Sequence, residues 1–230
     1  MAETTIEWTD ATWNSTTGCT RASAGCDHCY AFTMTKRLAA MGQKKYQGLV
    51  GNGHFNGVLR TWPDELSKPL AWKKPRMIFV NSMSDLFHDE VPLEFIDKVF
   101  AVMALCPQHT FQVLTKRADR MAAYFADLPR RVFDWDNGEG ETEEFLISGL
   151  HDDDETEGIL FDRCDEWLKF FNARNMGWPL SNVWLGVSVE NQMHANRIDN
   201  LLECPAAVRF VSFEPLLGPV MYPLDGIHWA

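Results

Sequence analysis

The sequence lacks the features of membrane, secreted and fibrous proteins. No stretch of its 230 residues approaches the roughly 18 consecutive apolar residues that a membrane-spanning helix needs. Residues 1–7 have neither the basic nor the apolar region of a signal peptide. With 46% hydrophobic residues, the chain can instead bury one sizeable core. We therefore expect a cytoplasmic protein with no membrane partner, folded as a single domain over residues 1–230.

Cysteines are few, and nothing about them indicates a disulfide framework. The chain has six cysteines, and cytosolic glutathione and thioredoxin keep such thiols reduced. Clustered cysteines in a protein of this kind point to metal binding. Cys106 and Cys204 each precede a proline, outside the cluster, and are expected to be small buried residues.

Basic residues are scarce relative to acidic ones. The chain has 21 Lys and Arg against 32 Asp and Glu, and fourteen of the acidic residues lie with a single Arg between Asp134 and Glu166. We interpret residues 134–170 as a solvated acidic insertion outside the core. The remaining 20 basic and 18 acidic residues give the rest of the chain a net charge of +2. This leaves a nucleotide or nucleic-acid substrate open, although no extended basic stripe is present.

The glycine fingerprint of dinucleotide-binding folds is also missing. No G-x-G-x-x-G follows a strand-like run. Four glycines fall instead within residues 47–57, which we interpret as a flexible loop. The sequence therefore gives little support to a Rossmann fold.

What the sequence does contain is a series of short apolar runs, each followed at once by polar residues. With helical patterns between them, such runs are typical of buried parallel strands. A helix is predicted to begin near Pro92, because apolar residues recur from Phe95 to Met103 at three- and four-residue steps. The clearest apolar runs are Met77–Val80, Thr110–Leu114, Val183–Val187 and Val208–Val211.

Two segments repeat one helix-to-strand pattern. In residues 103–107 and 201–205 a helix ends, a proline follows, and a strand begins about three residues later. Such repetition favours an α/β fold built as a partial (β/α) TIM-like barrel, in which the polar residues after the strands gather at one end. An open doubly wound sheet is the alternative.

Three cysteines form the most specific motif of the chain. Cys19, Cys26 and Cys29 have the spacing C-x6-C-x2-C, with glycines ahead of the first two. Glycines allow the tight turns and close amide approach that a cluster-binding loop needs. Three thiolates satisfy three irons of a 4Fe-4S cluster and leave one iron open to substrate or cofactor. We therefore predict an iron-sulfur cluster on these three residues.

Zinc is the alternative metal. Structural zinc is normally closed by four ligands, so a fourth partner has to be found. His28 lies between two of the cysteines, where it reaches the same ion only awkwardly. His54, Cys106 or Cys164 are the other candidates that the fold has to supply.

Six motifs along the chain are similar to those of one protein family. They are Ile6–Asn14, Gly18–Ala31, Phe79–Phe87, Val113–Arg117, Leu185–Asn191 and Phe213–Leu216. Jointly they resemble a phage and prophage family of three-cysteine proteins, functionally unassigned but similar to radical S-adenosylmethionine enzymes. The resemblance covers nearly the whole chain apart from the acidic insertion.

The resemblance implies a barrel of the radical S-adenosylmethionine type and a specific chemistry. A 4Fe-4S cluster reductively cleaves S-adenosylmethionine to a 5'-deoxyadenosyl radical, with electrons from a donor such as flavodoxin or ferredoxin. The implied substrate is a nucleotide or nucleic-acid base. The superfamily typically has C-x3-C-x2-C with an aromatic residue before the last cysteine. This chain has three more residues between the first two cysteines, and His28 stands at the aromatic position.

The same resemblance suggests cofactor-binding residues. The usual Gly-Gly-Glu stretch that holds the methionine amine is absent, and Ser82, Ser84 and Asp85 are expected to take its role. Tyr30, directly after the last cysteine, and Ser188, at the end of an apolar run, complete the expected cofactor contacts.

Charged residues directly after the apolar runs are further candidates. Lys116 and Arg117 are placed to pair with a cofactor carboxylate or substrate phosphate. Glu190 and Glu214 suit a ribose, an amine or catalytic proton transfer. The alternatives are an ordinary surface pair for the two cations and helix N-terminal carboxylates for the two acids.

Two functional hypotheses follow. The first is an iron-sulfur enzyme of the radical S-adenosylmethionine type. The second is a non-enzymatic zinc or iron-sulfur module that acts as a partner or regulator. Residues 227–230 resemble the start of a strand, so we also expect the natural chain to be longer.

Overall fold

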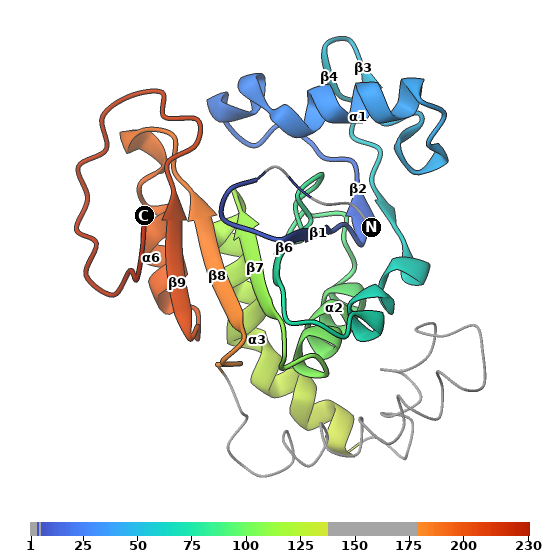
Figure 1. Cartoon of the computed structure of the whole chain (residues 1–230). Coiled ribbons are helices and arrows are strands. Elements are labelled where there is room, and N and C mark those ends of the chain that lie inside the picture. Colours follow the sequence, from blue (N-terminus) through green and yellow to red (C-terminus); the bar gives the residue numbers. More distant parts are fainter. Residues whose placement is uncertain (1–3, 5, 138–178) are drawn as a thin grey trace.

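The computed structural model describes residue 4, residues 6–137 and residues 179–230. Its centre is a five-stranded parallel sheet in which β6 to β9 coincide with the four predicted apolar runs (Figure 1). The first strand was not predicted, because a three-residue strand is too short to carry a pattern. In sheet order, the strands are β1 (Ala11–Trp13), β6 (Met77–Val80), β7 (Thr110–Thr115), β8 (Val183–Ser188) and β9 (Val208–Ser212).

The order of the strands separates the two predicted folds. Neighbours in the sheet follow the order of the chain without a reversal, whereas a doubly wound sheet reverses its order at a switch point. The doubly wound alternative is therefore wrong. The sheet is nevertheless open among the described residues, since β1 and β9 are not paired with each other. Beyond β9, Phe210 forms a single parallel bridge with Trp229.

Helices cover one face of this sheet (Figure 1). They are α2 (Leu93–Ala104), α3 (Ala118–Asn137) and α6 (Arg197–Glu203). The first confirms the helix predicted after Pro92, and its apolar residues are buried against strand residues such as Ile78. Cys106 and Cys204, which follow two of these helices, are fully buried as predicted.

The opposite face of the sheet is covered by aromatic side chains. The ring of Trp8 lies 4.7 Å from that of Phe79, and Trp229 stacks on Phe210 at 4.6 Å, as measured between centroids. Gly186 of β8 makes room for this stack, because a Cβ there would lie 2.4 Å from the ring of Phe210. These aromatic rings form one side of the space next to the polar carboxyl ends of the strands.

The N-terminal third adds a layer beyond the carboxyl ends of the strands (Figure 1). A small second core joins α1 to this layer through Ala31, Tyr46, Leu49 and Met83. The layer contains β2 (Thr16–Thr17) paired with β5 (Arg60–Thr61), the 3-10 helices η1 (Ala24–His28) and η2 (Lys44–Tyr46), α1 (Tyr30–Ala40), and β3 (Val50–Gly51) paired with β4 (His54–Phe55). The remaining short helices are η3 (Pro63–Glu65), η4 (Lys68–Ala71) and η5 (Gln192–His194).

The predicted flexible loop at residues 47–57 is wrong in its centre, where β3 and β4 form a tight hairpin. The two turn residues, Asn52 and Gly53, have φ of 49° and 85°. Positive φ at both positions is the requirement of a two-residue type I′ turn, for which Asn-Gly is a preferred pair. The Asn52–Gly53 pair is therefore a local sequence signal for this hairpin, and an interpretation based only on the number of glycines overlooked it.

Two other predictions concern the acidic insertion and the lack of a membrane-spanning helix. The acidic insertion at 134–170 lies outside the described residues, apart from 134–137, which end α3. Within the described part of the chain, none of the helices has the length and apolar character needed to cross a membrane.

Candidate functional site

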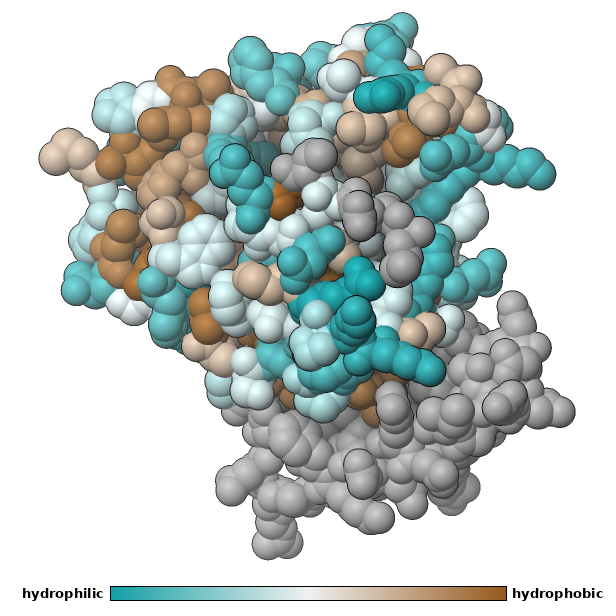
Figure 2. Space-filling view, in the orientation of Figure 1, coloured by the Kyte–Doolittle hydropathy of each residue, from teal (hydrophilic) through white to brown (hydrophobic). Residues whose placement is uncertain are grey.

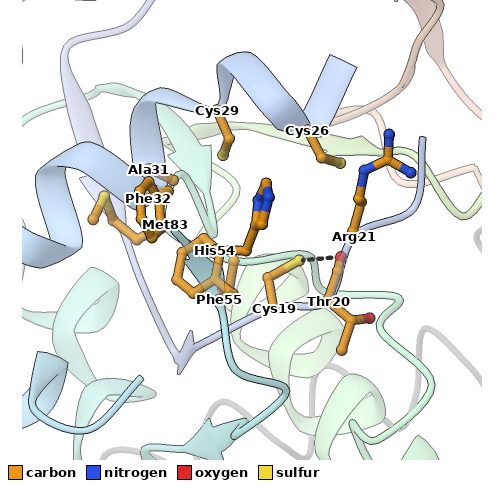
Figure 3. A pocket seen from close by; sticks show the side chains of 11 residues that line it. Cys19, Thr20, Arg21, Cys26, Cys29, Ala31, Phe32, His54, Phe55 and Met83 are labelled. Atoms are coloured by element: carbon orange, nitrogen blue, oxygen red, sulfur yellow. Dashed lines mark hydrogen bonds between the residues drawn. The ribbon is translucent and has the colours of Figure 1, made fainter. Parts of the chain in front are cut away.

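The three predicted cysteines lie around one cavity (Figure 3). Cys19 follows β2, Cys26 lies in η1, and Cys29 directly precedes α1. All three are half-buried free thiols. Gly18 permits this placement, because its φ is +90° and a Cβ would lie 1.9 Å from the carbonyl oxygen of Val58.

The cavity has a mostly apolar wall with a few polar groups. Among the polar residues, Arg21 is held by Asp27, with Nε donating to Oδ1 at 2.8 Å, and Ser84 donates to the carbonyl oxygen of Thr16 at 3.0 Å. His54 of β4 completes the polar side, although sequence reasoning considered it only as a zinc ligand. The apolar lining residues are Ala31, Phe32, Phe55 and Met83.

Two hydrogen-bond donors face the thiols. The backbone amide of Ala22 donates to Cys26 Sγ at 3.5 Å, and Arg117 Nη1 lies 3.9 Å from Cys19 Sγ. Burial raises the pKa of Cys19 to about 12, and the charge of Asp85 adds to this effect while Arg117 opposes it. Metal binding at Cys19 therefore has to displace a proton.

Arg117 and Asp85 form the buried support beneath Cys19. Arg117 Nη1 donates to Asp85 Oδ2 at 3.1 Å, and its Nη2 donates to Thr20 Oγ1 at 2.8 Å. Asp85 also accepts hydrogen bonds from the hydroxyl of Thr115 at 2.7 Å and from the amide of Lys116 at 3.1 Å. Neither Asp85 nor Arg117 lines this cavity. We therefore interpret Asp85 and Arg117 as residues that position the cysteine loop, which runs from residue 19 to residue 29.

His88 extends this support. Its Nδ1 accepts from the amide of Glu90 at 3.1 Å, and its Nε2 lies 2.8 Å from Thr20 Oγ1. Burial lowers the pKa of His88, and the charge of Arg117 lowers it further. A neutral ring that accepts at Nδ1 carries its proton on Nε2 and donates it to Thr20.

A larger pocket of about 490 Å³ adjoins the cavity. It opens at the carboxyl ends of β7, β8 and β9, where Leu114, Ser188 and Ser212 line it. Trp8 and Phe79 form its aromatic wall. Pockets of this size and mixed character are typical of small-molecule sites.

The cysteine loop separates the two spaces. Cys26 and Cys29 line both the cavity and the pocket, whereas Cys19 lines only the cavity. Tyr30, next along the chain, lines the pocket and donates its hydroxyl to the carbonyl oxygen of Ser82. Any group held by the three thiols would therefore touch the pocket.

Two charged side chains, Lys116 and Glu214, line the pocket. Lys116 lines the pocket, and its ammonium lies 3.6 Å from Glu190 Oε2 without a hydrogen bond to the described residues. Glu214 also lines the pocket and is exposed. Lys116 and Glu214 are thus the two charged side chains placed to meet a ligand there.

Glu190 has a different position from the one its sequence context suggested. Its side chain is fully buried and accepts from Arg197 Nη1 at 2.8 Å. A Cβ on Gly25 would lie 3.3 Å from this carboxylate and 3.3 Å from Pro215. Glu190 therefore forms the surface on which the loop between Cys19 and Cys26 rests.

The buried position of Glu190 affects its ionisation. Burial alone would raise its pKa, but the neighbouring Ser23 hydroxyl and the charges of Lys116 and Arg197 outweigh burial and hold the pKa at about 2. Such a group is a permanent anion at neutral pH, which does not suit a general base that must gain and lose a proton.

The structure thus divides the predicted site residues into three groups. The first group lines the cavity: Cys19, Cys26, Cys29 and Ser84. The second lines the pocket: Tyr30, Lys116, Ser188 and Glu214. The third lines neither and supports the loop from below: Ser82, Asp85, Arg117 and Glu190. Residues that sequence reasoning missed are Trp8, Thr20, Arg197 and Ser212.

The thiols are not arranged around a single point. Around one zinc ion with Zn–S bonds of about 2.3 Å, ligand sulfurs would lie roughly 3.8 Å apart. The described residues contain no group of three His, Cys, Asp or Glu side chains placed to hold one metal ion.

Comparisons with known proteins give one result. A model of the family described as "Protein of unknown function (DUF5131)" matches residues 3–230. Neither the curated proteins nor the solved structures contain a match.

Proposed function

We propose a function for this protein, which belongs to the DUF5131 family of proteins of unknown function, from the chemistry of its cysteine cavity. It is an iron-sulfur enzyme of the radical S-adenosylmethionine type. The observation that carries the proposal is the shared wall: Cys26 and Cys29 line both the thiol cavity and the pocket of about 490 Å³. A cluster in the cavity would contact a cofactor in the pocket.

The residues present fit a 4Fe-4S cluster. Cys19, Cys26 and Cys29 supply three thiolates and leave one iron open. The amide of Ala22 and the guanidinium of Arg117 face two of the sulfurs, and hydrogen bonds of this kind tune cluster potentials. When bound and reduced, such a cluster supplies the one electron that cleaves S-adenosylmethionine to methionine and a 5'-deoxyadenosyl radical.

The pocket residues have matching roles. Lys116 pairs with the methionyl carboxylate, because its side chain lines the pocket and its buried ammonium makes no hydrogen bond to the described residues. Trp8 and Phe79 provide an aromatic surface for adenine. Ser188 offers a hydroxyl and Glu214 a carboxylate acceptor for the ribose. The apolar wall excludes water from a reactive radical.

The sheet is consistent with this assignment. Parallel strands in sequential order, with helices on one face and pocket-lining residues at the carboxyl ends, support the proposal of a partial β/α barrel that is left open. The proposed substrate is a nucleotide or nucleic-acid base, and the proposed electron donor is a flavodoxin or ferredoxin.

Anaerobic reconstitution tests this function. The protein is loaded with iron and sulfide, reduced with dithionite and incubated with S-adenosylmethionine, and 5'-deoxyadenosine is assayed. We expect the wild type and Cys204→Ala to form it and Cys26→Ala to form none. Cys204 is the matched control, because it is a free cysteine buried in the main core and distant in sequence from the loop.

The outcomes separate the alternatives. A full cluster without deoxyadenosine would disprove the cofactor assignment and leave a different iron-sulfur function. Colourless protein with stoichiometric zinc, lost in Cys26→Ala, would favour the non-enzymatic zinc module.

A further inference from the structure

We propose that His54 is a fourth protein donor at the cysteine cavity and binds the iron that the three thiolates leave open until S-adenosylmethionine displaces it. The inference rests on the proposed function for the identity of the bound group. The position of the imidazole among the three thiols carries it (Figure 3).

The β3–β4 hairpin fixes the position of His54. Its Cα is paired with Gly51 across the two-residue turn, and Phe55 is paired with Val50. Phe55 and Val50 pack against the small core that also contacts Cys29. The hairpin and the third cysteine are therefore anchored to the same cluster of side chains.

His54 is exposed to solvent, and its imidazole lines the cavity. Its ring centroid lies 6.3 Å from that of Phe32, which also lines the cavity. Within the described residues, neither ring nitrogen of His54 makes a hydrogen bond, whereas His88 is engaged on both sides.

Other potential fourth donors are less well placed. Cys106 is fully buried in the main core, away from the cavity. Cys164 lies outside the described residues. His28 lines the pocket and not the cavity. Of the histidines that the structure describes, His54 alone lines the cavity with all three cysteines.

The chemistry of this donor is simple. A neutral imidazole nitrogen binds iron as well as zinc. Exchange of the imidazole for the amine and carboxylate of S-adenosylmethionine moves no electrons and breaks only the bond to nitrogen. His54 would therefore close the open position in the absence of cofactor and release it when cofactor arrives.

Nitrogen hyperfine spectroscopy tests the proposal directly. Protein labelled with ¹⁵N-histidine is reconstituted, reduced with dithionite and studied by pulsed electron paramagnetic resonance. We expect a ¹⁵N coupling of directly bound nitrogen in the wild type, its loss in His54→Ala, and its loss from the wild type on addition of S-adenosylmethionine. His28→Ala is the matched control and should keep the coupling, since His28 faces the other space.

Each outcome decides the question. A wild-type cluster without ¹⁵N coupling, or a coupling that persists in His54→Ala, would overturn the proposal while leaving the proposed function intact. If the protein holds zinc instead, X-ray absorption gives the answer. A zinc ion bound by three sulfurs and by one nitrogen that is lost in His54→Ala would retain His54 as a donor but refute the iron-sulfur cluster. Four non-histidine ligands would refute both the cluster and His54 as a donor.

Discussion

Glu190 is the buried carboxylate on which the cysteine loop rests. It is fully buried and lies against Lys116 and Arg197. Its folded-state pKa is about 2, compared with 4.5 for an ordinary glutamate. A lowered pKa stabilises the fold above the unfolded-state value, and this stability is lost as pH falls from about 4.5 towards 2. The difference corresponds to roughly 3 kcal/mol.

We therefore expect Glu190→Gln to be less stable than the wild type by about 3 kcal/mol at pH 7, and to match it near pH 2. The reason is that the amide cannot gain the charge interactions that the carboxylate has above pH 4.5. Urea unfolding of both proteins from pH 7 to pH 2 measures this. A constant difference across the whole range would show that Glu190 acts through shape and not through charge.

Arg117 has three partners in the support of Cys19: Asp85, Thr20 and the Cys19 thiol itself. Its removal leaves Asp85 as a buried charge without its cation. We expect Arg117→Ala to lower the free energy of unfolding by about 3–5 kcal/mol, as for other broken buried pairs. Denaturant unfolding measures this loss.

A double-mutant cycle provides the control. In the combined Asp85→Ala and Arg117→Ala variant, the loss should be smaller than the sum of the two single losses, because the residues share one interaction. Additive losses would contradict a direct role of the ion pair. Arg117→Ala should also lower iron retention, since the guanidinium faces Cys19.

Residue chemistry was easier to predict from sequence than residue orientation. The thiols of Cys19, Cys26 and Cys29 do converge on one cavity, as their spacing indicated. Asp85 and Glu190 also stand where polar residues follow strands, but neither of them lines the pocket. The arginines that hold them, Arg117 and Arg197, come from elsewhere in the fold or from a following helix, and no local pattern reveals such pairs.

At the scale of elements, the cysteine loop depends on one close contact. Gly25 packs against Glu190 and Pro215, and a Cβ added at residue 25 would lie 3.3 Å from atoms of both side chains. We expect Gly25→Ala to shift the loop and reduce iron bound per chain after reconstitution, with a loss of stability of about 1–3 kcal/mol from overpacking.

Gly218→Ala is the matched control for this change. A Cβ at Gly218 meets only Asn191, at an ordinary 3.9 Å, so iron content and unfolding should match the wild type. Iron and sulfide analysis of both variants makes the comparison. Equal iron in Gly25→Ala and wild type would show that the loop tolerates displacement from Glu190.

The elements themselves were predictable in proportion to their length and burial. Strands β6 to β9 and helix α2 carry long apolar patterns and were confirmed. The short β1 and the β3–β4 hairpin were missed, because two or three residues carry no periodicity. Asn52–Gly53 was the available signal for the hairpin. Closure of the sheet is a global property, and local patterns do not determine it.

At the scale of the molecule, charge is distributed in a way that total composition hides. Residues 28–63 contain no Asp or Glu and five Lys or Arg. This segment forms α1 and the β3–β4 hairpin around the cysteine cavity. Figure 2 shows hydrophilic side chains along the upper edge, where these elements lie, interrupted by apolar ones. Exposed Met34 and Met41 are among the apolar residues of this layer.

If the proposed electron donor is acidic, this surface would attract it, because opposite charges steer association and would bring the donor next to the cysteines. We expect the double charge reversal Lys36→Glu and Arg37→Glu to slow reduction of the reconstituted protein by flavodoxin at least tenfold at low ionic strength, within the range of steering effects. Both residues are exposed on α1. Reduction by dithionite, a small reagent, should be unaffected.

The matched control is the same reversal at Lys73 and Lys74, which are exposed shortly before β6 begins, at the opposite end of the sheet from the cysteines. This variant has the same net charge, so its rate should stay close to that of the wild type if location matters. Raising the salt concentration should remove the difference between the two variants, because surface charges are screened over about 10 Å at 0.1 M. Equal slowing by both reversals would mean that total charge, and not a docking surface, controls the rate. Unchanged flavodoxin reduction with weaker oligonucleotide binding would instead assign this face to the proposed nucleic-acid substrate.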